Sequence, residues 1–547
     1  MSSFFTTPAS QRKRKRNEDG AGKSSGRNRA ASRPQKKSRE DRDESISGSD
    51  SEGLGDVDEE TSHTLSAESS SEDDEDVAAR RTKLASRYLE NTRKEILAEG
   101  FDAKDIDNEL LAQRMGERLK EDTAESKGRI YRWMADDFSY DECRTAKFSN
   151  GSGVVTGVAV CAPYIYTVSK DMRLSKWRMP EAGQDNSPAL KPKLVGSSRG
   201  DRSRKRDIKY DQHTNEIYCV AASQDGKFVA TGGKDRKLVV WDAATLKPLR
   251  AFAHHRDAVI SVCFRRGTNQ LFSASRDRTI KIWSLNELAY VETLYGHQDE
   301  IVDIASLNQE HCVTAGARDR TARFWKVVDE SQLIFRGGGA HNSLRKARRE
   351  EGDDSYVETK RFYEGSMDRV AMVDEDNFVT GSDNGALALW NVHKKKPVFT
   401  YPLAHGVEDP KKLDEVSAEL HPDPINLPEP QPRWITALAC IPYSNIIVSG
   451  SWDGQVRAWK VSEDRRTLEA IGPLVTSTGP TMINGELGHE ESKFKGVIND
   501  LAVFETGKKG KEDMYVVAVT GKEQRLGRWQ EVGGRNAGIV VQIPRKP

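Results

Sequence analysis

The sequence has few cysteines and no long hydrophobic run. Six cysteines are scattered through 547 residues without paired spacing. This pattern argues against a disulfide framework and a zinc site, and for reduced, mostly buried thiols in an intracellular protein. No apolar stretch approaches the length of a membrane span, and no secretory signal is present. We therefore expect no membrane partner and no bound metal.

Motifs for catalysis are also missing. The chain has no glycine-rich phosphate loop and no metal-binding histidine cluster. We therefore expect a protein that is not an enzyme, that holds no cofactor and that takes no small-molecule substrate.

The formal net charge is zero, from 85 basic and 85 acidic residues, but the charges are unevenly distributed. Residues 1–39 carry twelve Lys or Arg against two acids, and residues 40–76 carry sixteen acids against Arg42 alone. Both stretches are rich in Ser and Gly and poor in aromatics, so residues 1–76 should be a disordered tail, first basic and then acidic. One basic run predicts nuclear import, the alternative being a merely solvated tail. The run is Arg12, Lys13, Arg14, Lys15 and Arg16.

The composition of the chain changes at residue 77, and the pattern of residues 77–135 indicates a short helical segment. Apolar side chains recur there with helical spacing, for example at Ile106, Leu110 and Leu111. The two predicted helices are too short and too charged to form a core of their own. They either pack on the rim of the domain that follows or bind a partner.

Between His213 and Trp325 the chain repeats itself every 42 residues. The repeated residues are His213, His255 and His297, then Asp235, Asp277 and Asp319, and finally Trp241, Trp283 and Trp325. Apolar residues between them lie in runs of four to six, which indicates β-strands rather than helical repeats. A period of 40–45 with an early His and a late Trp is typical of the four-stranded blades of a WD-repeat β-propeller.

The repeated polar residues have a structural role in such a fold. The predicted set in one blade is His255, Ser273, Asp277 and Trp283, and Thr231 supplies the hydroxyl in the blade before it. Their side chains can form one chain of hydrogen bonds that fixes the blade. Ala315 stands at the hydroxyl position of the next blade, which predicts an incomplete network there. His, Ser and Asp also make hydrolytic triads, but a set that recurs in every repeat favours structure over catalysis.

Further tryptophans extend the pattern to seven blades. They are Trp177, Trp241, Trp283, Trp325, Trp390, Trp459 and Trp529. We therefore expect an all-β protein with a seven-bladed propeller over residues 144–547. The ring has no free sheet edge if the chain ends supply its last strand, and either Arg144–Phe148 or Gly538–Ile543 can do so.

Long loops are predicted at 180–211, 331–361 and 402–433, and two basic clusters are candidates for RNA or RNP binding. The first cluster is Arg199, Arg202, Arg204, Lys205 and Arg206. Arg265 and Arg266 lie in a short loop between the first and second strands of a blade, outside the expected core. They either clasp phosphates or belong to a solvated loop. The two clusters are expected on opposite rims.

Several segments carry a resemblance to a known family. They are Gly128–Ile130, Phe264–Thr268, Tyr290–Asp299, Val313–Gly316 and Leu526–Trp529. From about residue 80 onward, the chain resembles the WD-repeat protein of the U3 small nucleolar ribonucleoprotein. The resemblance implies a nucleolar protein of the small-subunit processome that supports pre-18S rRNA processing. Its implied partners are U3 small nucleolar RNA, at the box B/C region, and a small kink-turn-binding protein.

A function of another class stays open at this point. Propellers also receive peptides, as substrate receptors of ubiquitin ligases or as histone chaperones, and the acidic tract would suit a chaperone. Ligase adaptors commonly show Trp-Asp-x-Arg on a third strand, whereas Trp241-Asp242 is followed here by Ala243-Ala244. The preferred prediction is a nuclear and nucleolar scaffold protein.

Overall fold

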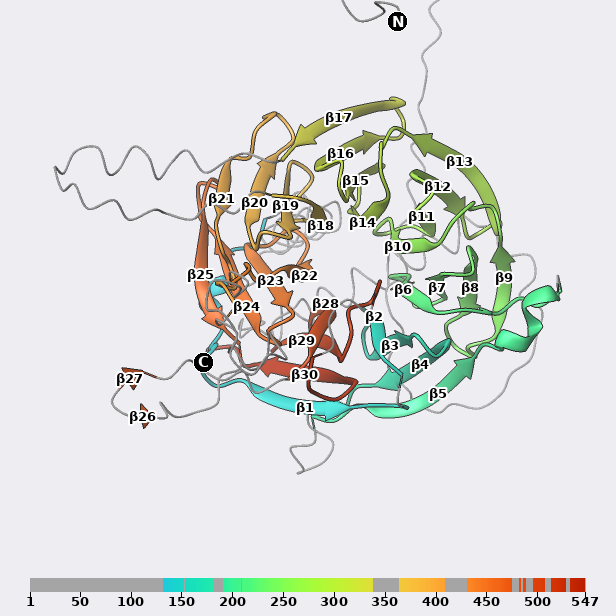
Figure 1. Cartoon of the computed structure of the whole chain (residues 1–547), viewed down its shortest axis with the longest axis horizontal. Coiled ribbons are helices and arrows are strands. Elements are labelled where there is room, and N and C mark those ends of the chain that lie inside the picture. The colour runs from blue at the N-terminus through green and yellow to red at the C-terminus, as the bar shows by residue number, and fades with distance from the viewer. Residues whose placement is uncertain are drawn as a thin grey trace, which may run out of the picture. The chain divides into compact units, whose positions relative to one another are not determined.

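A computed structural model describes residues 131–546, except 152, 181–189, 208, 338–363, 409–429, 475–481, 484–485, 488–494, 507–512 and 528–531. Seven four-stranded antiparallel sheets are arranged as the blades of a ring (Figure 1). The predicted seven-bladed propeller is therefore confirmed. The predicted tail, the import signal and most of the helical segment lie outside the described residues.

The first six blades follow the chain in order. Blade 1 contains β2 (Val155–Cys161), β3 (Tyr164–Ser169), β4 (Arg173–Arg178) and β5 (Lys193–Arg199). Blade 2 contains β6 (Ile217–Ala222), β7 (Phe228–Gly233), β8 (Leu238–Asp242) and β9 (Pro248–Phe252). Blade 3 contains β10 (Val259–Phe264), β11 (Gln270–Ser275), β12 (Thr279–Ser284) and β13 (Ala289–Tyr295).

Blades 4 to 6 repeat this arrangement. Blade 4 contains β14 (Ile301–Ser306), β15 (His311–Gly316), β16 (Thr321–Lys326) and β17 (Ser331–Arg336). Blade 5 contains β18 (Met367–Met372), β19 (Asn377–Ser382), β20 (Leu387–Asn391) and β21 (Phe399–Tyr401). Blade 6 contains β22 (Ile435–Cys440), β23 (Ile446–Ser451), β24 (Val456–Val461) and β25 (Leu468–Pro473). A separate two-stranded hairpin is formed by β26 (Met482–Ile483) and β27 (Glu486–Leu487).

Blade 7 is built from both ends of the propeller. Its strands are β28 (Val497–Glu505), β29 (Met514–Gly521), β30 (Ala537–Ile543) and the early strand β1 (Arg144–Phe148), in the order β1-β30-β29-β28. Arg144 pairs with Gln542 and Phe148 with Gly538. Both segments that sequence analysis left as alternatives therefore take part, β30 as the third strand and β1 as the outer one. Pairing of β1 with β30 gives blade 7 the same four strands as the other six blades and closes the ring.

Trp529, the predicted tryptophan of blade 7, lies outside the described residues. The third strand of blade 7 is β30, which begins at Ala537, so another residue takes the third-strand position there. By strand register, Val541 opposite Val516 has the position that Trp241 opposite Val229 has in blade 2. The other six predicted tryptophans all lie on third strands.

Two of the predicted long loops contain regular structure. The range 180–211 includes β5 and the short 3-10 helix η3 (Arg202–Arg206), and the range 331–361 begins with β17. These segments are strands because each completes the outer edge of a blade whose third strand would otherwise be unpaired. In the range 402–433, Val407 bridges to Pro432, and residues 409–429 between them lie outside the described residues.

The described end of the predicted helical segment packs against the propeller. The backbone N–H groups of Met134 and Ala135 donate to Asn445 Oδ1 at 2.9 and 3.0 Å. Ala135 begins the 3-10 helix η2 (Ala135–Asp137), and Phe138 after it is buried with residues of blades 6 and 7. This short stretch therefore lies on the ring, while residues 77–130 are outside the described part.

Four blades contain a complete hydrogen-bond network of the predicted kind. In blade 3, His255 Nε2 lies 2.8 Å from Ser273 Oγ and its Nδ1 lies 3.0 Å from Asp277, while Trp283 Nε1 donates to Ser273 at 2.9 Å. The blade 2 network joins His213, Thr231, Asp235 and Trp241 in the same way. Because a carboxylate only accepts, the imidazole hydrogen must lie on Nδ1.

Blade 4 corrects the expectation drawn from Ala315. His297 Nε2 and Trp325 Nε1 each lie 2.8 Å from Thr314 Oγ1, and His297 Nδ1 lies 2.8 Å from Asp319. The hydroxyl is therefore supplied by the residue before Ala315, and the network is complete.

Blade 6 has a network that sequence analysis missed. His405 lies 2.9 Å from Ser449 Oγ and 3.3 Å from Asp453, and Trp459 Nε1 donates to Ser449 at 2.8 Å. The long insertion between His405 and β22 removes the 42-residue spacing that marks the other three. Blades 1 and 5 retain only the Trp-to-Thr bond, 2.9 Å in each case.

We expect Asp277→Ala to lower the free energy of unfolding by about 2–4 kcal/mol. The Asp277 carboxylate accepts from His255, from the backbone of Arg256 at 2.9 Å, and from both the backbone and the hydroxyl of Thr279 at 3.0 and 2.6 Å. Its removal strands several buried donors at once. Thermal or denaturant melts of the purified chain measure the loss.

Asn384→Ala is the matched comparison, since Asn384 takes the same turn position in blade 5. Its Oδ1 accepts from Ser382 Oγ at 2.7 Å and from Ala386 N at 3.0 Å, with no histidine and no charge involved. This variant should lose about 1 kcal/mol. A larger loss for Asn384→Ala than for Asp277→Ala would contradict the structural role assigned to the network.

Candidate nucleic-acid interface

The meander of each blade separates its connections onto two faces of the ring. Connections between first and second strands, and between third and fourth strands, lie on one face, which we call the lower face. Turns between second and third strands, and the connections from one blade to the next, lie on the opposite, upper face. Arg265 and Arg266, between β10 and β11, are on the lower face. The cluster at 199–206, between blades 1 and 2, is on the upper face.

The lower-face arginines are engaged by the neighbouring blades. Arg265 Nε donates to the carbonyl of Asn308 at 2.9 Å, and its Nη1 donates to Gln270 Oε1 at 3.2 Å. The Arg266 guanidinium lies 5.9 Å from the centre of the Tyr443 ring, which belongs to blade 6. These contacts join first-to-second-strand loops from different blades. Both side chains therefore contribute to the packing of the ring and are only partly available to a ligand.

The upper-face cluster is more accessible. Asp201 caps η3 by accepting from Ser203 N at 2.9 Å, and Arg202, Arg204, Lys205 and Arg206 of that helix are all exposed. Arg204 forms a surface ion pair with Asp201 at 3.8 Å, which solvent screens. Arg199 lies just before, at the end of β5. The arrangement presents a short, strongly basic ridge.

The turns of blades 2, 3 and 4 continue this basic surface, a feature that sequence analysis did not use. In each turn the network Asp is flanked by exposed basic residues. They are Lys234 and Arg236, Arg276 and Arg278, and Arg318 and Arg320. Lys234 pairs with Glu216 at 3.2 Å and Arg276 with Glu300 at 2.5 Å. The corresponding flanking positions of blades 5 and 6 hold no basic residue, so the surface does not extend to the turns of these two blades.

We call these residues, together with the cluster at 199–206, the upper basic surface. Their signal in the sequence is the recurrence of a basic residue, Asp and Arg at the 42-residue period. Cationic side chains spaced along one face suit the phosphates of a nucleic-acid backbone.

A buried charge network lies beneath both faces, at the centre of the ring. The first strands of successive blades contact one another in a closed cycle, β2–β6–β10–β14–β18–β22–β28–β2. Arg369 on β18 donates to the carbonyls of Thr436 and Asn499, and its Nη1 lies 3.7 Å from both Asp303 and Asp500. It thereby joins the first strands of blades 4, 5, 6 and 7.

Arg525 completes this network from the connection between β29 and β30. It is only 3% exposed, and its guanidinium donates to the carbonyls of Ile260 and Val302 at 3.1 and 3.0 Å, on the first strands of blades 3 and 4. Burial lowers the pKa of Arg525 to about 10; nearby Arg369 adds to the lowering, and Asp303 and Asp500 oppose it. The connection therefore crosses the axis of the ring and is anchored on its far side.

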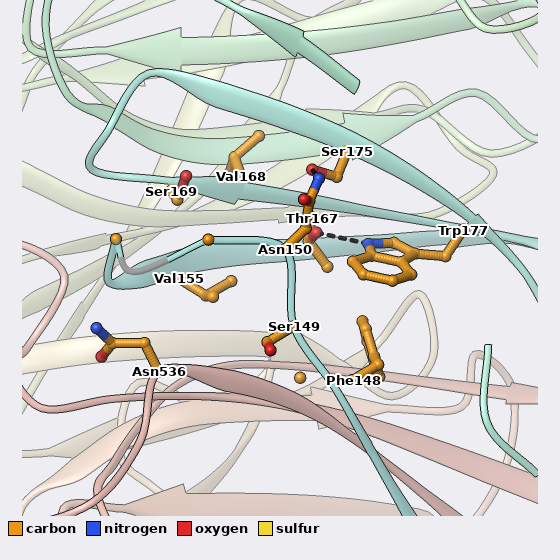
Figure 2. Close-up of a pocket in the computed structure, with 13 residues that line it drawn as sticks. Phe148, Ser149, Asn150, Val155, Thr167, Val168, Ser169, Ser175, Trp177 and Asn536 are labelled. Atoms are coloured by element: carbon orange, nitrogen blue, oxygen red, sulfur yellow. Dashed lines mark hydrogen bonds between the residues drawn. The ribbon is translucent and has the colours of Figure 1, made fainter. Parts of the chain in front are cut away.

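A small pocket adjoins blade 1, one of the blades without the network histidine. It lies between blades 7 and 1, where Trp177 Nε1 donates to Thr167 and Asn150 donates to Ser175 Oγ at 3.1 Å (Figure 2). Its accessible volume is about 20 Å³, which is room for roughly one water molecule. The pocket is therefore too small for a ligand larger than a water molecule.

Two features are absent from the described part of the chain. It contains no group of three or more His, Cys, Asp and Glu side chains that could hold a metal ion. It also contains no helix with the length and apolar character needed to cross a membrane.

We expect Arg525→Met to lower the free energy of unfolding by about 3–5 kcal/mol, because the carbonyls of Ile260 and Val302 would stay buried without their donor and Arg369 alone would face the two buried acids. Arg535→Met is a matched control from the same connection, since Arg535 is exposed. It should change stability by no more than about 0.5 kcal/mol. Equal melting curves for the two variants would show that the charge network does not hold the ring together.

Comparison with known proteins adds to this geometry. The family model described as WD domain, G-beta repeat, matches residues 205–242, 246–284, 289–326 and 427–460. Ribosomal RNA-processing protein 9 of Saccharomyces cerevisiae is 34% identical to this chain, with 86% of this chain and 89% of the relative covered. U3 small nucleolar RNA-interacting protein 2 of Homo sapiens is 35% identical, with 87% and 84% covered.

A solved structure agrees with these relatives. The structure of U3-55K shares 30% sequence identity with a TM-score of 0.55, covering 73% of this chain and 98% of that one. The similarity extends far beyond the generic repeat positions. The chain belongs to the family of U3 snoRNP-associated WD-repeat proteins that includes ribosomal RNA-processing protein 9 and U3 small nucleolar RNA-interacting protein 2.

Proposed function

We propose that this chain is a non-catalytic scaffold subunit of the U3 small nucleolar RNP that binds U3 snoRNA for pre-18S rRNA processing. The observation that carries the proposal is the identity of 34–35% with U3-associated and rRNA-processing relatives over most of both chains. The upper basic surface supports an RNA ligand in particular, because its exposed arginines and lysines can neutralise phosphates. A WD-repeat ring with these relatives favours a scaffold over an enzyme.

Protein partners belong to the same proposal. We infer a small kink-turn-binding protein next to the RNA, and other proteins of the small-subunit processome. A rigid ring with two separate faces suits simultaneous contact with RNA and protein. The U3-associated relatives support a nuclear and nucleolar location for this chain, and the run from Arg12 to Arg16 is the proposed import signal.

Crosslinking the tagged protein in cells and sequencing the attached RNA tests the proposal. U3 snoRNA should dominate the recovered reads. Crosslinks to peptides or histones, with no enrichment of U3 among the RNA reads, would instead support the peptide-binding class of propeller.

The upper basic surface makes a quantitative prediction. Replacing Arg202, Arg204 and Arg206 with Gln should weaken binding of a U3 box B/C fragment. The slope of log affinity against log salt should flatten by about two to three units, one for each lost phosphate contact. Filter binding or anisotropy at several salt concentrations measures this, with the kink-turn partner present.

A charge-matched control is available on the lower face. Lys394, Lys395 and Lys396 are exposed in the connection between β20 and β21, and their replacement by Gln removes the same charge. This control should leave affinity and slope nearly unchanged. The same loss of affinity in both variants would mean that general charge, rather than the upper face, attracts the RNA.

The lower-face pair is tested separately. Replacing Arg265 and Arg266 with Glu should reduce the salt slope by up to about two units if the pair contacts phosphates. Because Arg265 also bonds to Asn308 and Gln270, the melting temperature of this variant must be measured alongside its affinity.

A further inference from the structure

A pocket on the upper face of blade 4 collects three arginines. Arg320 comes from the turn between β15 and β16, Arg323 from β16, and Arg336 from the end of β17. Gln298, from the connection that enters blade 4, closes another side. The pocket has a volume of about 460 Å³, much more than a single water or ion requires.

Arg323 has a buried donor beside this pocket. The residue is only 6% exposed, and its Nη1 donates to Gln332 Oε1 at 2.8 Å. Its Nε–H is buried and has no hydrogen-bond acceptor among the described residues. A buried guanidinium donor left unpaired is costly, so an acceptor supplied by a ligand would lower the free energy of the site.

The acid among the residues that line the pocket, Asp319, belongs to the blade network. It accepts from His297 Nδ1 at 2.8 Å and from Thr321 N at 3.0 Å. Arg320 makes a long bond, 3.4 Å, to the backbone carbonyl of Glu364. Burial lowers the pKa of Arg323, Asp319 opposes this shift, and the nearby charge of Arg336 adds to the lowering, so three cations and one carboxylate line the pocket.

In blade 3, the basic side chain at the position equivalent to Arg323 has a hydrogen-bond partner. By strand register, Lys281 and Tyr295 of blade 3 take the positions of Arg323 and Arg336. Lys281 Nζ donates to Thr293 Oγ1 at 2.7 Å, so the cation of blade 3 has a partner within its own sheet. Repeat architecture alone therefore does not require an arginine pair in blade 4.

We propose that Arg320, Arg323 and Arg336 form a phosphate subsite that holds a backbone phosphate of RNA bound along the upper basic surface. The planar guanidinium fork matches the oxygens of a phosphodiester. The pocket lies at the end of the row of basic turns that runs from Lys234 in blade 2 to Arg320 in blade 4. A row of cations suits a continuous chain of phosphates better than the isolated phosphate of a modified peptide. The RNA occupant rests on the proposed function.

The test uses the full chain and two exposed pocket residues, so that the fold is retained. The double variant Arg320→Gln, Arg336→Gln should bind the U3 box B/C fragment at least tenfold more weakly than wild type. Its salt slope should flatten by about one unit, for one lost phosphate. The double variant Lys394→Gln, Lys395→Gln on the lower face is the charge-matched control and should behave as wild type.

Arg323→Lys separates geometry from charge. It keeps the positive charge but loses the Nε–H and the fork, so affinity should fall with little change in salt slope. Melting curves in inorganic phosphate against chloride, at equal ionic strength, give a readout without RNA. Phosphate should raise the melting temperature of the wild type but not that of the Arg320, Arg336 variant.

Each failure has its own signature. If the pocket variants bind RNA as tightly as the wild type does, RNA is not the occupant of the pocket. If phosphate still stabilises only the wild type in that case, a phosphorylated peptide becomes the preferred ligand. Equal melting shifts in both proteins would overturn the subsite itself. Absence of U3 binding by the wild type would overturn the proposed function, independently of the pocket.

Discussion

Two arginines buried at the centre of the ring constrain the rest of the propeller. Arg369 and Arg525 cannot shed their charges, so their burial is tolerable only while Asp303, Asp500 and several strand carbonyls stay within reach. Those partners lie on first strands from different blades. A shift of any of blades 3 to 7 would separate a buried charge from one of its partners, and the positions of these five blades are therefore coupled through the axis.

The hydrogen-bond networks act on a smaller scale. Each of the four complete ones ties a turn to a strand within a single blade, and blades 1 and 5 manage with the Trp-to-Thr bond alone. Local networks define the shape of a blade, and the axial charges define how the blades are placed. The exposed basic turns are positioned by both kinds of contact, because their basic residues flank a network aspartate such as Asp277.

The sequence was most informative where interacting residues are close along the chain. His255 and Asp277 are 22 residues apart, and such a spacing repeats visibly. The misplacement at Ala315 has a simple cause: His297 to Thr314 spans 17 residues where His255 to Ser273 spans 18, and Trp325 follows Thr314 by 11 where Trp283 follows Ser273 by 10. One residue lost and one gained cancel, so the period hides the shift.

Long-range contacts left no comparable trace. His405 is separated from Asp453 by 48 residues because of an insertion, and Arg525 meets Ile260 across 265 residues. Nothing in the local pattern around Arg525 predicts where its side chain ends. The pocket at Arg323 was missed for a related reason: it needs the pairing of β16 with β17, in a range that sequence analysis treated as a loop.

The pairing of β1 with β30 has a consequence for synthesis. The ribosome makes β1 before any complete blade and β30 after all the others, so β1 has no partner on a nascent chain. Arg525 likewise emerges only after the inner strands that it bridges. A nascent chain from which β30 has not yet emerged therefore carries the upper basic surface on a ring that is open and lacks Arg525 at its axis. Stable docking of a rigid partner across several blades must wait until β30 has paired with β1, which makes closure of the ring a condition for entry into a larger particle.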